Sequence, residues 1–406
     1  MNKQTRNIVI TAVCSVLVTA FACFLSFFMY NALFRPAGSA ADYSDKLAEI
    51  QAYIDRYAIY DFNESVAEDY VYSGYVYGLE DDMYCAYYNA DAYADTMSSR
   101  EGNFTGIGIT VRNTEDISDG LFVYRVIGNS PAESAGLRPC DRIVSVDGQD
   151  ITAMTYEQAV DMLLGEEGSS VTVGVRRGGS ADTPAQDLEF NMLRQDFVQR
   201  EVDYSQYDGL GYIQIHNFTS VAEEEFKDAL TTLISAGVEG FIFDVRNNPG
   251  GNLDTVEHML DMLMPEGEPI IFIESKDGQT VEYSTGSRIS DLPCVVLINS
   301  DSASASELFS STLRDVCGAE LIGTQSYGKA IGQRTFRLSD GSGLKLTTFR
   351  YFTKSRIDFN GIGLVPDEVV TLSEDETLRF YSLTREQDAQ FMKAAEVLKG
   401  KIEKGE

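Results

Sequence analysis

Two apolar runs in the second half of the chain each end in a turn of small residues and continue into a helix-like pattern. Gly240–Arg246 leads into Asn-Asn-Pro-Gly-Gly at 247–251, and Cys294–Asn299 leads into Ser-Ala-Ser-Ala-Ser at 302–306. Short apolar runs bounded by glycine, proline or serine are typical of strands that are buried in a sheet. Strands that alternate with helices in this way predict a layered α/β domain.

The same alternation extends to both sides of these runs. We expect further strands at 209–216, 269–274, 280–283, 320–323 and 344–349, and helices at 221–235, 305–316 and 374–401. Near the start, Leu47, Ile50 and Ile54 recur at three- and four-residue spacings, which is the periodicity of a helix. This pattern predicts helices at 43–58 and 63–77, followed by a loop at 80–88.

The composition limits the kind of partner that the chain can bind. With 406 residues and 44% hydrophobic content, the chain can bury a substantial core and is long enough for two or three domains. Its 32 basic and 63 acidic residues give a formal charge of −31. This charge argues against nucleic acid and against an anionic membrane surface bound through a basic face. An acidic, solvated surface is the simpler interpretation, and cationic substrates are left open.

An uncharged apolar run extends from Ile8 to Phe34, and Lys3 and Arg6 precede it. A run of about 20 or more apolar residues can cross a bilayer as a helix. The positive-inside rule then puts the N-terminus in the cytoplasm and everything after Arg35 outside. A cleavable signal peptide is the competing interpretation, but its apolar region is usually shorter. We therefore expect an uncleaved, single-pass anchor in the cell membrane.

The cysteines and histidines give little support to a metal site. Cys14 and Cys23 lie in the apolar run, and the other four cysteines are Cys85, Cys140, Cys294 and Cys317. An exported location permits disulfides without requiring them. A bridge between Cys294 and Cys317 is conceivable, but Cys294 opens a strand and is simply expected to be buried. His216 and His258 lie in no cluster with metal-ligand spacing, so we expect neither a metal nor another cofactor.

Ser304 admits two interpretations. With Glu307 it forms the pattern S-x-x-E, in which a serine caps a helix and the glutamate reaches back to the serine amide. A serine at a helix start also has free N–H groups beside it, and these can stabilise an oxyanion. Such a nucleophile needs a base, and a lysine can serve where a dry pocket lowers its pKa. Lys329, between Gly328 and Ala330, is the candidate.

The motif Ser-Ala-Ser-Ala-Ser-Glu, followed by Tyr327-Gly-Lys-x-x-x-Gln333, resembles the C-terminal processing peptidases, also called tail-specific proteases. The resemblance implies that Ser304 is the nucleophile, that Lys329 is the general base, and that Gln333 orients the lysine. Two local departures are Asp301 and Ala330, where relatives often have glycine.

A second phrase of the same family is D-x-R-x-N-P-G-G, which spans Asp244–Gly251. Relatives place one oxyanion donor at its glycine pair. The resemblance therefore implies a donor at Gly250 or Gly251, and we expect the other to be the N–H of Ala305. The glycine pair alone would suggest only a tight turn.

The region 102–194 resembles a bacterial PDZ domain through the phrases S-P-A-x-x-A-G-L at 130–137 and D-x-I-x-x-V-D-G at 141–148. PDZ domains bind an extended peptide as an added strand and hold its terminal carboxylate with backbone N–H groups. The residues implied for that loop are Gly106, Ile107, Gly108 and Ile109. Many relatives carry an arginine just before the glycine that ends the PDZ helix, whereas this chain has Leu164, so regulation through that arginine is not expected.

The sequence thus predicts an α/β protein with a PDZ domain, an N-terminal transmembrane helix, a helical arm and a layered, crotonase-like peptidase core. The predicted parts are a cytoplasmic N-terminus and anchor (1–36), a helical segment (42–100), the PDZ domain (102–194), the serine peptidase core (195–372) and a C-terminal helical segment (373–406). The expected function is that of a membrane-anchored, extracytoplasmic serine endopeptidase that recognises the C-terminal tails of exported proteins. A homodimer is also consistent with the resemblance.

Two alternatives remain open. The first is an inactive PDZ scaffold that binds the C-termini of exported proteins. The second is non-proteolytic ligand binding, as in retinoid-binding relatives of the same fold. The presence of Ser304, Lys329 and Gln333 argues against the first, and the PDZ domain argues against the second.

Overall fold

The computed structural model describes residues 43–79, 82–114, 116–178 and 184–405. The predicted membrane segment 8–34 lies outside these ranges. Within them, we find no helix with both the length and the apolar character needed to cross a membrane. The internal contacts divide the chain into two units, with the boundary in the sequence between Ala67 and Glu68. Each unit is described by itself.

The first unit contains helix α2 (Ser44–Tyr57) and the start of α3 (Glu64–Val76). Both predicted helices of this segment are therefore confirmed. No side chain of α2 is buried, and Tyr53 and Tyr57 are more than half exposed. The helical periodicity of the sequence here does not correspond to a stripe packed on a core.

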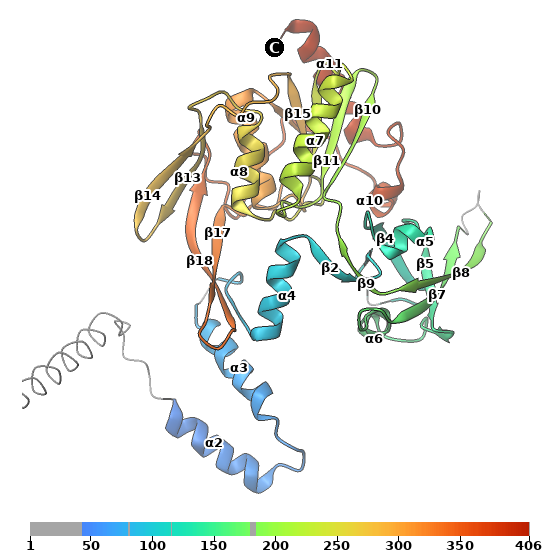
Figure 1. Cartoon of the computed structure of the whole chain (residues 1–406), viewed down its shortest axis with the longest axis vertical. Helices are drawn as coiled ribbons and strands as arrows, with labels where there is room; N and C mark the ends of the chain where they lie inside the picture. The colour runs from blue at the N-terminus through green and yellow to red at the C-terminus, as the bar shows by residue number, and fades with distance from the viewer. Residues whose placement is uncertain (1–42, 80–81, 115, 179–183, 406) are drawn as a thin grey trace, which may run out of the picture. The chain divides into compact units, whose positions relative to one another are not determined.

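The region with PDZ resemblance is built on one antiparallel sheet (Figure 1). Its strands, in spatial order, are β3 (Ile109–Val111), β4 (Leu121–Val126), β5 (Arg142–Val146), β7 (Ser170–Arg177) and β8 (Gln186–Leu193), and β6 (Gln149–Asp150) pairs with β5. Helices α5 (Pro131–Ala135) and α6 (Tyr156–Leu163) cover a separate hydrophobic core. α6 starts at a capping box formed by Thr155 and Gln158.

The central sheet of the second unit has six strands in the order β10-β11-β12-β15-β16-β19. Their bounds are β10 (Val202–Tyr207), β11 (Leu210–Ile215), β12 (Phe241–Asp244), β15 (Cys294–Ile298), β16 (Glu320–Gly323) and β19 (Glu368–Val369). All neighbours except β10 and β11 are parallel. Strands buried on both faces explain the continuous apolar runs in the sequence.

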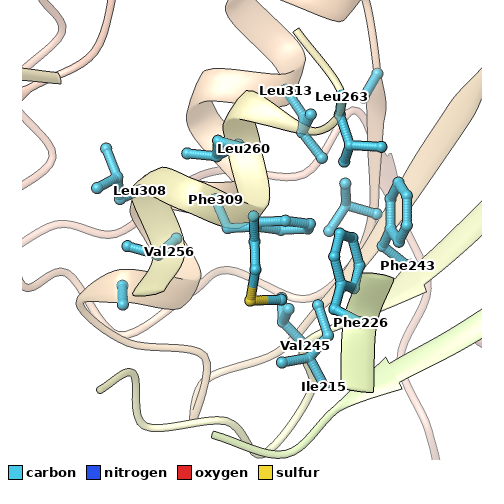
Figure 2. Close-up of a cluster of buried hydrophobic side chains, with 14 of the residues drawn as sticks. Ile215, Phe226, Phe243, Val245, Val256, Leu260, Leu263, Leu308, Phe309 and Leu313 are labelled. Atoms are coloured by element: carbon cyan, nitrogen blue, oxygen red, sulfur yellow. The ribbon is translucent and has the colours of Figure 1, made fainter. Parts of the chain in front are cut away.

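Helices cover both faces of this sheet. Phe241 and Phe243 of β12 point into a core with α7 (Ala222–Ser235), α8 (Leu253–Asp261) and α9 (Ala305–Cys317). Figure 2 shows this core, where Phe309 of α9 packs edge-on against Phe226 and Phe243. Ile242 points the other way, into a core with α11 (Ala389–Lys404). The predicted layered α/β architecture is thereby confirmed.

A second sheet and a short ribbon complete the unit. The second sheet contains β1 (Ala86–Tyr88), β18 (Gly343–Phe352), β13 (Pro269–Ser275) and β14 (Gly278–Tyr283) in that order, and β17 (Ile331–Arg337) also pairs with β18. β2 (Asn103–Gly106) pairs with β9 (Gln195–Val198), and α4 (Ala90–Arg100) precedes β2. The prediction of a loop throughout 80–88 is wrong for its end, because residues 86–88 find a partner in the distant strand β18.

The C-terminal segment is helical, as we expected over 374–401, but the helix is interrupted. It forms α10 (Glu374–Leu378), the 3₁₀ turn η1 (Phe380–Ser382) and α11. The break ends at Asp388, which caps α11 by accepting a hydrogen bond from the Phe391 N–H at 3.0 Å. The same carboxylate binds Arg246, so tertiary contacts hold this segment out of a continuous helix.

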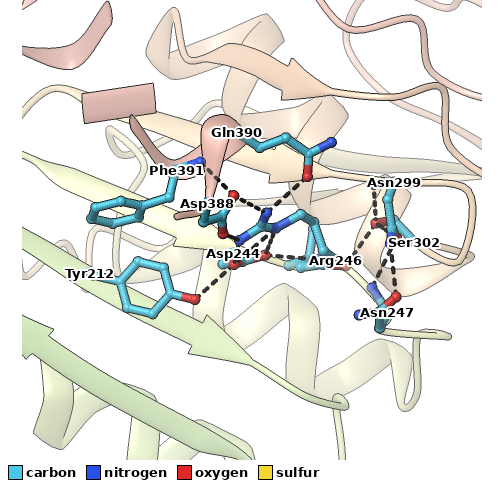
Figure 3. A network of polar contacts seen from close by, with 10 residues as sticks. Tyr212, Asp244, Arg246, Asn247, Asn299, Ser302, Asp388, Gln390 and Phe391 are labelled. Atoms are coloured by element: carbon cyan, nitrogen blue, oxygen red, sulfur yellow. Dashed lines mark hydrogen bonds and ion pairs between the residues drawn. The ribbon is translucent and has the colours of Figure 1, made fainter. Parts of the chain in front are cut away.

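Arg246 lies at the centre of a buried polar network at the end of β12 (Figure 3). Its guanidinium donates to Asp388 at 3.0 and 2.7 Å and to Asp244 at 2.6 to 3.1 Å. Tyr212 donates to Asp244 at 2.7 Å, and Gln390 accepts from Arg246 at 2.8 Å. Burial alone would raise the pKa of Asp244, but the charge and hydrogen bonds of Arg246 lower it. The network joins α11 to the beginning of the 247–251 turn.

Candidate active site

A cavity of about 570 Å³ brings together most of the predicted catalytic residues. Its lining includes Ser304, Ala305, Gly251, Lys329 and Gln333. Gly250 lines an adjacent cavity of about 400 Å³, which shares Gly251 with the first. The described part of the chain contains no group of three or more His, Cys, Asp or Glu side chains that could hold a metal ion.

Ser304 stands immediately before α9 in a strained backbone conformation. Its φ of 56° and ψ of −113° lie outside the extended region that an N-cap residue normally adopts. Ser304 and Glu307 are arranged as a capping box, but the Glu307 N–H donates to the Ser304 carbonyl at 2.9 Å, and the Ser304 hydroxyl makes no hydrogen bond to the described residues by the usual distance criteria. Strain of this kind costs about 1–3 kcal/mol and persists where the surrounding structure imposes it. The capping interpretation of this serine is therefore incomplete, and its hydroxyl is left for another role.

Glu307 holds the backbone on both sides of the cavity. Its side chain is fully buried and accepts hydrogen bonds from the N–H groups of Ser304 at 2.9 Å and Lys329 at 2.7 Å. It also accepts from the Gly328 N–H at 2.7 Å and the Ser326 hydroxyl at 2.5 Å. The S-x-x-E pattern predicted only the first of these four contacts. The others join segments that are distant in sequence.

Tyr351 holds the same two segments from their carbonyl side. Its hydroxyl lies 2.9 Å from the Ser304 carbonyl oxygen and 2.6 Å from that of Lys329. The side chain is buried, and burial raises its pKa well above the usual value, so the hydroxyl is a donor. No motif in the sequence singled out this residue, because its role arises from the position of β18 beside α9.

Two backbone N–H groups beside Ser304 have no hydrogen-bond partner in the described residues. One belongs to Ala305, the first residue of α9, and the other to Gly251. The Gly250 N–H, by contrast, donates to the Asn248 side chain at 2.8 Å. Of the two glycines that the sequence left open, Gly251 thus has the available donor. Gly250 allows close approach, since a Cβ there would lie 2.9 Å from the Ser304 Cβ.

Lys329 has an unpaired amine in the described part of the chain. Its Nζ atom lies 4.4 Å from the centroid of the Tyr84 ring. Burial, and then the charge of Lys345, lower the pKa of Lys329, as a general base requires. The side chains of Ser304 and Lys329 line one cavity, and no hydrogen bond joins the lysine amine to the serine hydroxyl within the described residues.

Gln333 is not hydrogen-bonded to Lys329 in this structure. Its amide donates to the Thr347 hydroxyl at 3.0 Å, and that hydroxyl lies 3.1 Å from the Asp82 carboxylate. The residue therefore lines the cavity as expected, but its orienting role stays a prediction. Sequence analysis missed Tyr84 and Asp82, which come from the loop before β1.

The predicted carboxylate-binding loop lies between β2 and β3. Ile107 is buried, and Gly108 has a φ of 78° and packs against Ser130 so closely that a Cβ would overlap it. The N–H groups of Ile107 and Gly108 have no hydrogen-bond partner within the described residues. Gly106 ends β2, and Ile109 begins β3 and pairs with Val126.

The position of the missing PDZ arginine is exposed. Leu164 is 60% exposed, and the end of α6 is instead held by Arg194, which donates to the carbonyls of Leu163 at 2.9 Å and Met162 at 3.0 Å.

The four cysteines in the described residues are free. His216 is buried beside Asp203, and His258 is exposed and paired with Glu223.

Two regions of the chain match models of known protein families. Residues 209–370 match the model of peptidase family S41, and residues 122–177 match a PDZ domain. The carboxyl-terminal-processing proteases of Synechocystis and Picosynechococcus are each 30% identical to the chain. The matches cover 77% of the chain and 72% of the first relative, and 82% of the chain and 79% of the second.

Two solved structures of proteases are similar to this chain. The photosystem II D1 C-terminal processing protease matches with a TM-score of 0.51 and 25% identity, over 83% of this chain and 91% of that protein. A putative S41 protease from Bacteroides fragilis has the same fold, with a TM-score of 0.59 and 17% identity, over 73% of this chain and 83% of that protein. The chain belongs to peptidase family S41 and is a serine-type protease of the carboxyl-terminal-processing group.

Proposed function

We propose that the protein is a membrane-anchored, extracytoplasmic endopeptidase that binds substrate C-termini through its PDZ domain and cleaves with a Ser304–Lys329 dyad. The arrangement around Ser304 is the observation that carries the proposal. Ser304 is strained, its hydroxyl makes no hydrogen bond within the described residues, and two backbone N–H groups unpaired in those residues lie beside it. The same cavity contains Lys329, whose pKa is lowered. These are the parts that acyl transfer requires.

The reaction begins when the Ser304 hydroxyl attacks the carbonyl carbon of the scissile amide and the neutral amine of Lys329 takes the hydroxyl proton. The carbonyl oxygen becomes an oxyanion, which the N–H groups of Gly251 and Ala305 stabilise. Lys329 returns the proton to the leaving amine, and water then hydrolyses the ester bond to Ser304. Glu307 and Tyr351 hold the main chain of both residues, which supports a fixed spacing between the serine and lysine segments.

The PDZ domain supplies the substrate. The free N–H groups of Ile107 and Gly108 bind the terminal carboxylate, and the tail extends along β3 as an added strand. The unpaired amides in a loop that precedes an edge strand support this role, because a carboxylate can satisfy both. The chain upstream of the tail then enters the cavity at Ser304.

The anchor is the part of the proposal that rests on sequence alone. The uncharged run 8–34 behind Lys3 and Arg6 supports a single-pass helix with the catalytic part outside the cytoplasm. Immunoblots of membrane and soluble fractions test it. Full-length protein in the membrane fraction is expected, and a shortened protein found only in the soluble fraction would contradict the anchor.

The dyad is tested with the soluble part from residue 43 onward and casein as substrate. Ser304→Ala and Lys329→Ala should each abolish cleavage while the circular dichroism spectrum is unchanged. Lys276→Ala, at an exposed turn, serves as the matched control. A fluorophosphonate should label the unmodified protein and not Ser304→Ala. Cleavage by either dyad variant would refute the dyad, and absence of both cleavage and labelling in the unmodified protein would favour a non-catalytic PDZ scaffold.

A further inference from the structure

Three cationic side chains of the active-site cavity have no carboxylate partner in the part of the chain that the structure describes. They are Arg100, Lys329 and Lys345, and none of their charged groups forms a hydrogen bond or ion pair within those residues. The Nζ atoms of Lys329 and Lys345 lie 4.4 and 5.8 Å from the ring centroids of Tyr84 and Tyr88. The chain has 63 acidic and 32 basic residues, so carboxylates are not scarce. The dyad explains the free amine of Lys329 but leaves Arg100 and Lys345 without a role.

The backbone of Arg100 is fixed beside the proposed oxyanion donors. Its carbonyl accepts hydrogen bonds from the Asn252 side chain at 3.1 Å and the Ser220 N–H at 3.3 Å. Asn252 follows Gly251 directly, so α4 ends against the turn that carries the proposed donor. Arg100 is half-buried and lines both this cavity and the adjacent one, and its side chain therefore extends from a fixed backbone position.

Lys345 lies further along the same cavity. Alternate residues of a strand point to one face, and Lys345, Phe349 and Tyr351 of β18 all line the cavity. Tyr351 contacts Ser304, and six residues of strand correspond to roughly 20 Å. The charge of Lys345 also lowers the pKa of Lys329, after the larger effect of burial.

Carboxylates also line the cavity. Glu223 and Asp254 come from α7 and α8, and Glu223 forms a pair with His258 at 2.8 Å. In the described residues, no carboxylate of this lining pairs with Arg100, Lys329 or Lys345. A negative group of the substrate would supply the partner that these cations lack within those residues.

We propose that Arg100 and Lys345 form a subsite that binds a carboxylate of the substrate chain. The carboxylate belongs either to an acidic side chain near the scissile bond or to the chain terminus. An arginine presents a fork of donors that matches a carboxylate, and a lysine adds a mobile charge. The inference rests on the proposed function, since it assigns a substrate class to the same cavity. It makes Arg100 and Lys345 residues that determine specificity.

The spacing of the two cations limits where the carboxylate lies. An extended substrate advances about 3.3 Å per residue. Arg100 is anchored beside the oxyanion turn, and Lys345 lies roughly 20 Å of strand from Tyr351. The subsite therefore corresponds to a position within about six residues of the scissile bond. A scan over those positions can locate it.

The test uses a fluorogenic parent peptide with only uncharged residues and an amidated C-terminus. Twelve derivatives each replace one glutamine by glutamate, at six positions on either side of the scissile bond. The ratio of kcat/KM for derivative and parent is measured in the unmodified enzyme, Arg100→Gln and Lys345→Gln. This ratio cancels any effect of a substitution on Lys329 itself. Lys276→Gln, at the exposed β13–β14 turn, is the control.

One or more glutamate positions should raise kcat/KM about tenfold in the unmodified enzyme, as expected for a hydrogen-bonded charge pair. The preference should fall to about twofold or less in Arg100→Gln or Lys345→Gln and should be retained in Lys276→Gln. A further arm compares the parent with its free acid. If the two variants lose the preference for the acid over the amide instead, the bound carboxylate is the chain terminus. The PDZ contribution to that preference is the same in all four enzymes.

The outcomes separate this inference from the proposed function. Cleavage of the parent with no carboxylate preference at any position would overturn the subsite, as would a preference that both variants retain. If the unmodified enzyme cleaves neither the peptides nor casein, the proposed function itself is refuted.

Discussion

Two buried polar networks in the same unit have different roles. The first surrounds Arg246, whose guanidinium is paired with Asp244 and Asp388 (Figure 3). The second surrounds Glu307, whose carboxylate binds the N–H groups of Ser304 and Lys329. In the first network the charged side chains pair with one another. In the second, the carboxylate binds main-chain groups and leaves the side-chain tips of the serine and the lysine unpaired.

The difference shows how a fold can keep reactive groups available. Buried polar groups normally find partners, because an unpaired one costs about 1–3 kcal/mol. The Glu307 network satisfies the backbone at full burial and confines the unsatisfied groups to a cavity. These groups are the Ser304 hydroxyl, the Lys329 amine and the N–H groups of Gly251 and Ala305. Structural and catalytic networks can thus be told apart by which atoms they leave free.

The largest effect on stability is expected for Arg246→Met. The substitution leaves Asp244 and Asp388 buried without their common cation and should lower the free energy of unfolding by about 3–5 kcal/mol. Urea denaturation measures it. Arg176→Met removes an exposed ion pair with Asp187 and should cost less than about 1 kcal/mol. Equal losses in the two variants would remove the distinction between the networks.

Glu307→Gln should lower both activity and stability. The amide group cannot accept all four hydrogen bonds that the carboxylate accepts, so the Ser304 and Lys329 segments separate. We expect a loss of about 2–3 kcal/mol in unfolding free energy. We also expect a fall in kcat of about a hundredfold, because small displacements of reacting groups are costly. A variant with unchanged kcat would show that this carboxylate has only a structural role.

Ser304→Gly should remove activity and increase stability. Glycine adopts a positive φ without strain, whereas serine at 56° is strained by about 1–3 kcal/mol. The greater freedom of glycine in the unfolded chain offsets up to about 1 kcal/mol of this gain. The net increase should be about 1 kcal/mol, measured by thermal and urea unfolding. Ser304→Ala, which keeps the strain, is the control, and a glycine variant less stable than it would contradict the expectation.

The smallest expected effect is a shift in the pH profile of Lys345→Gln. A lysine base works only when neutral, so kcat/KM for an uncharged peptide should rise with pH through the pKa of Lys329. That pKa lies below 10.5, first because of burial and then because of the Lys345 charge. Removing this charge raises the pKa and moves the rising limb to higher pH. A rising limb at the same pH or at lower pH in Lys345→Gln would contradict this coupling. In the control Lys276→Gln, the rising limb of the pH profile should not move.

The sequence predicted the elements whose signals are local. The buried strands Phe241–Asp244 and Cys294–Ile298, with the turns that follow them, were recognisable because apolar runs and small residues are encoded within a few positions. The resemblance of Ser304, Lys329 and the glycine pair to a known family predicted which residues meet. The structure brings Ser304, Lys329 and Gly251 to one cavity, as expected.

Only the tertiary structure decided the contacts that depend on distant segments. Glu307 appeared in the sequence as one half of a helix cap, yet it binds two separate chain segments. Tyr351 and Arg100 carried no local signal, and Gln333 turned out to bind Thr347. Local sequence specifies secondary structure through short-range sterics and hydrophobic spacing. Which side chains share a cavity depends instead on strand order and register, and here these link residues far apart in the chain.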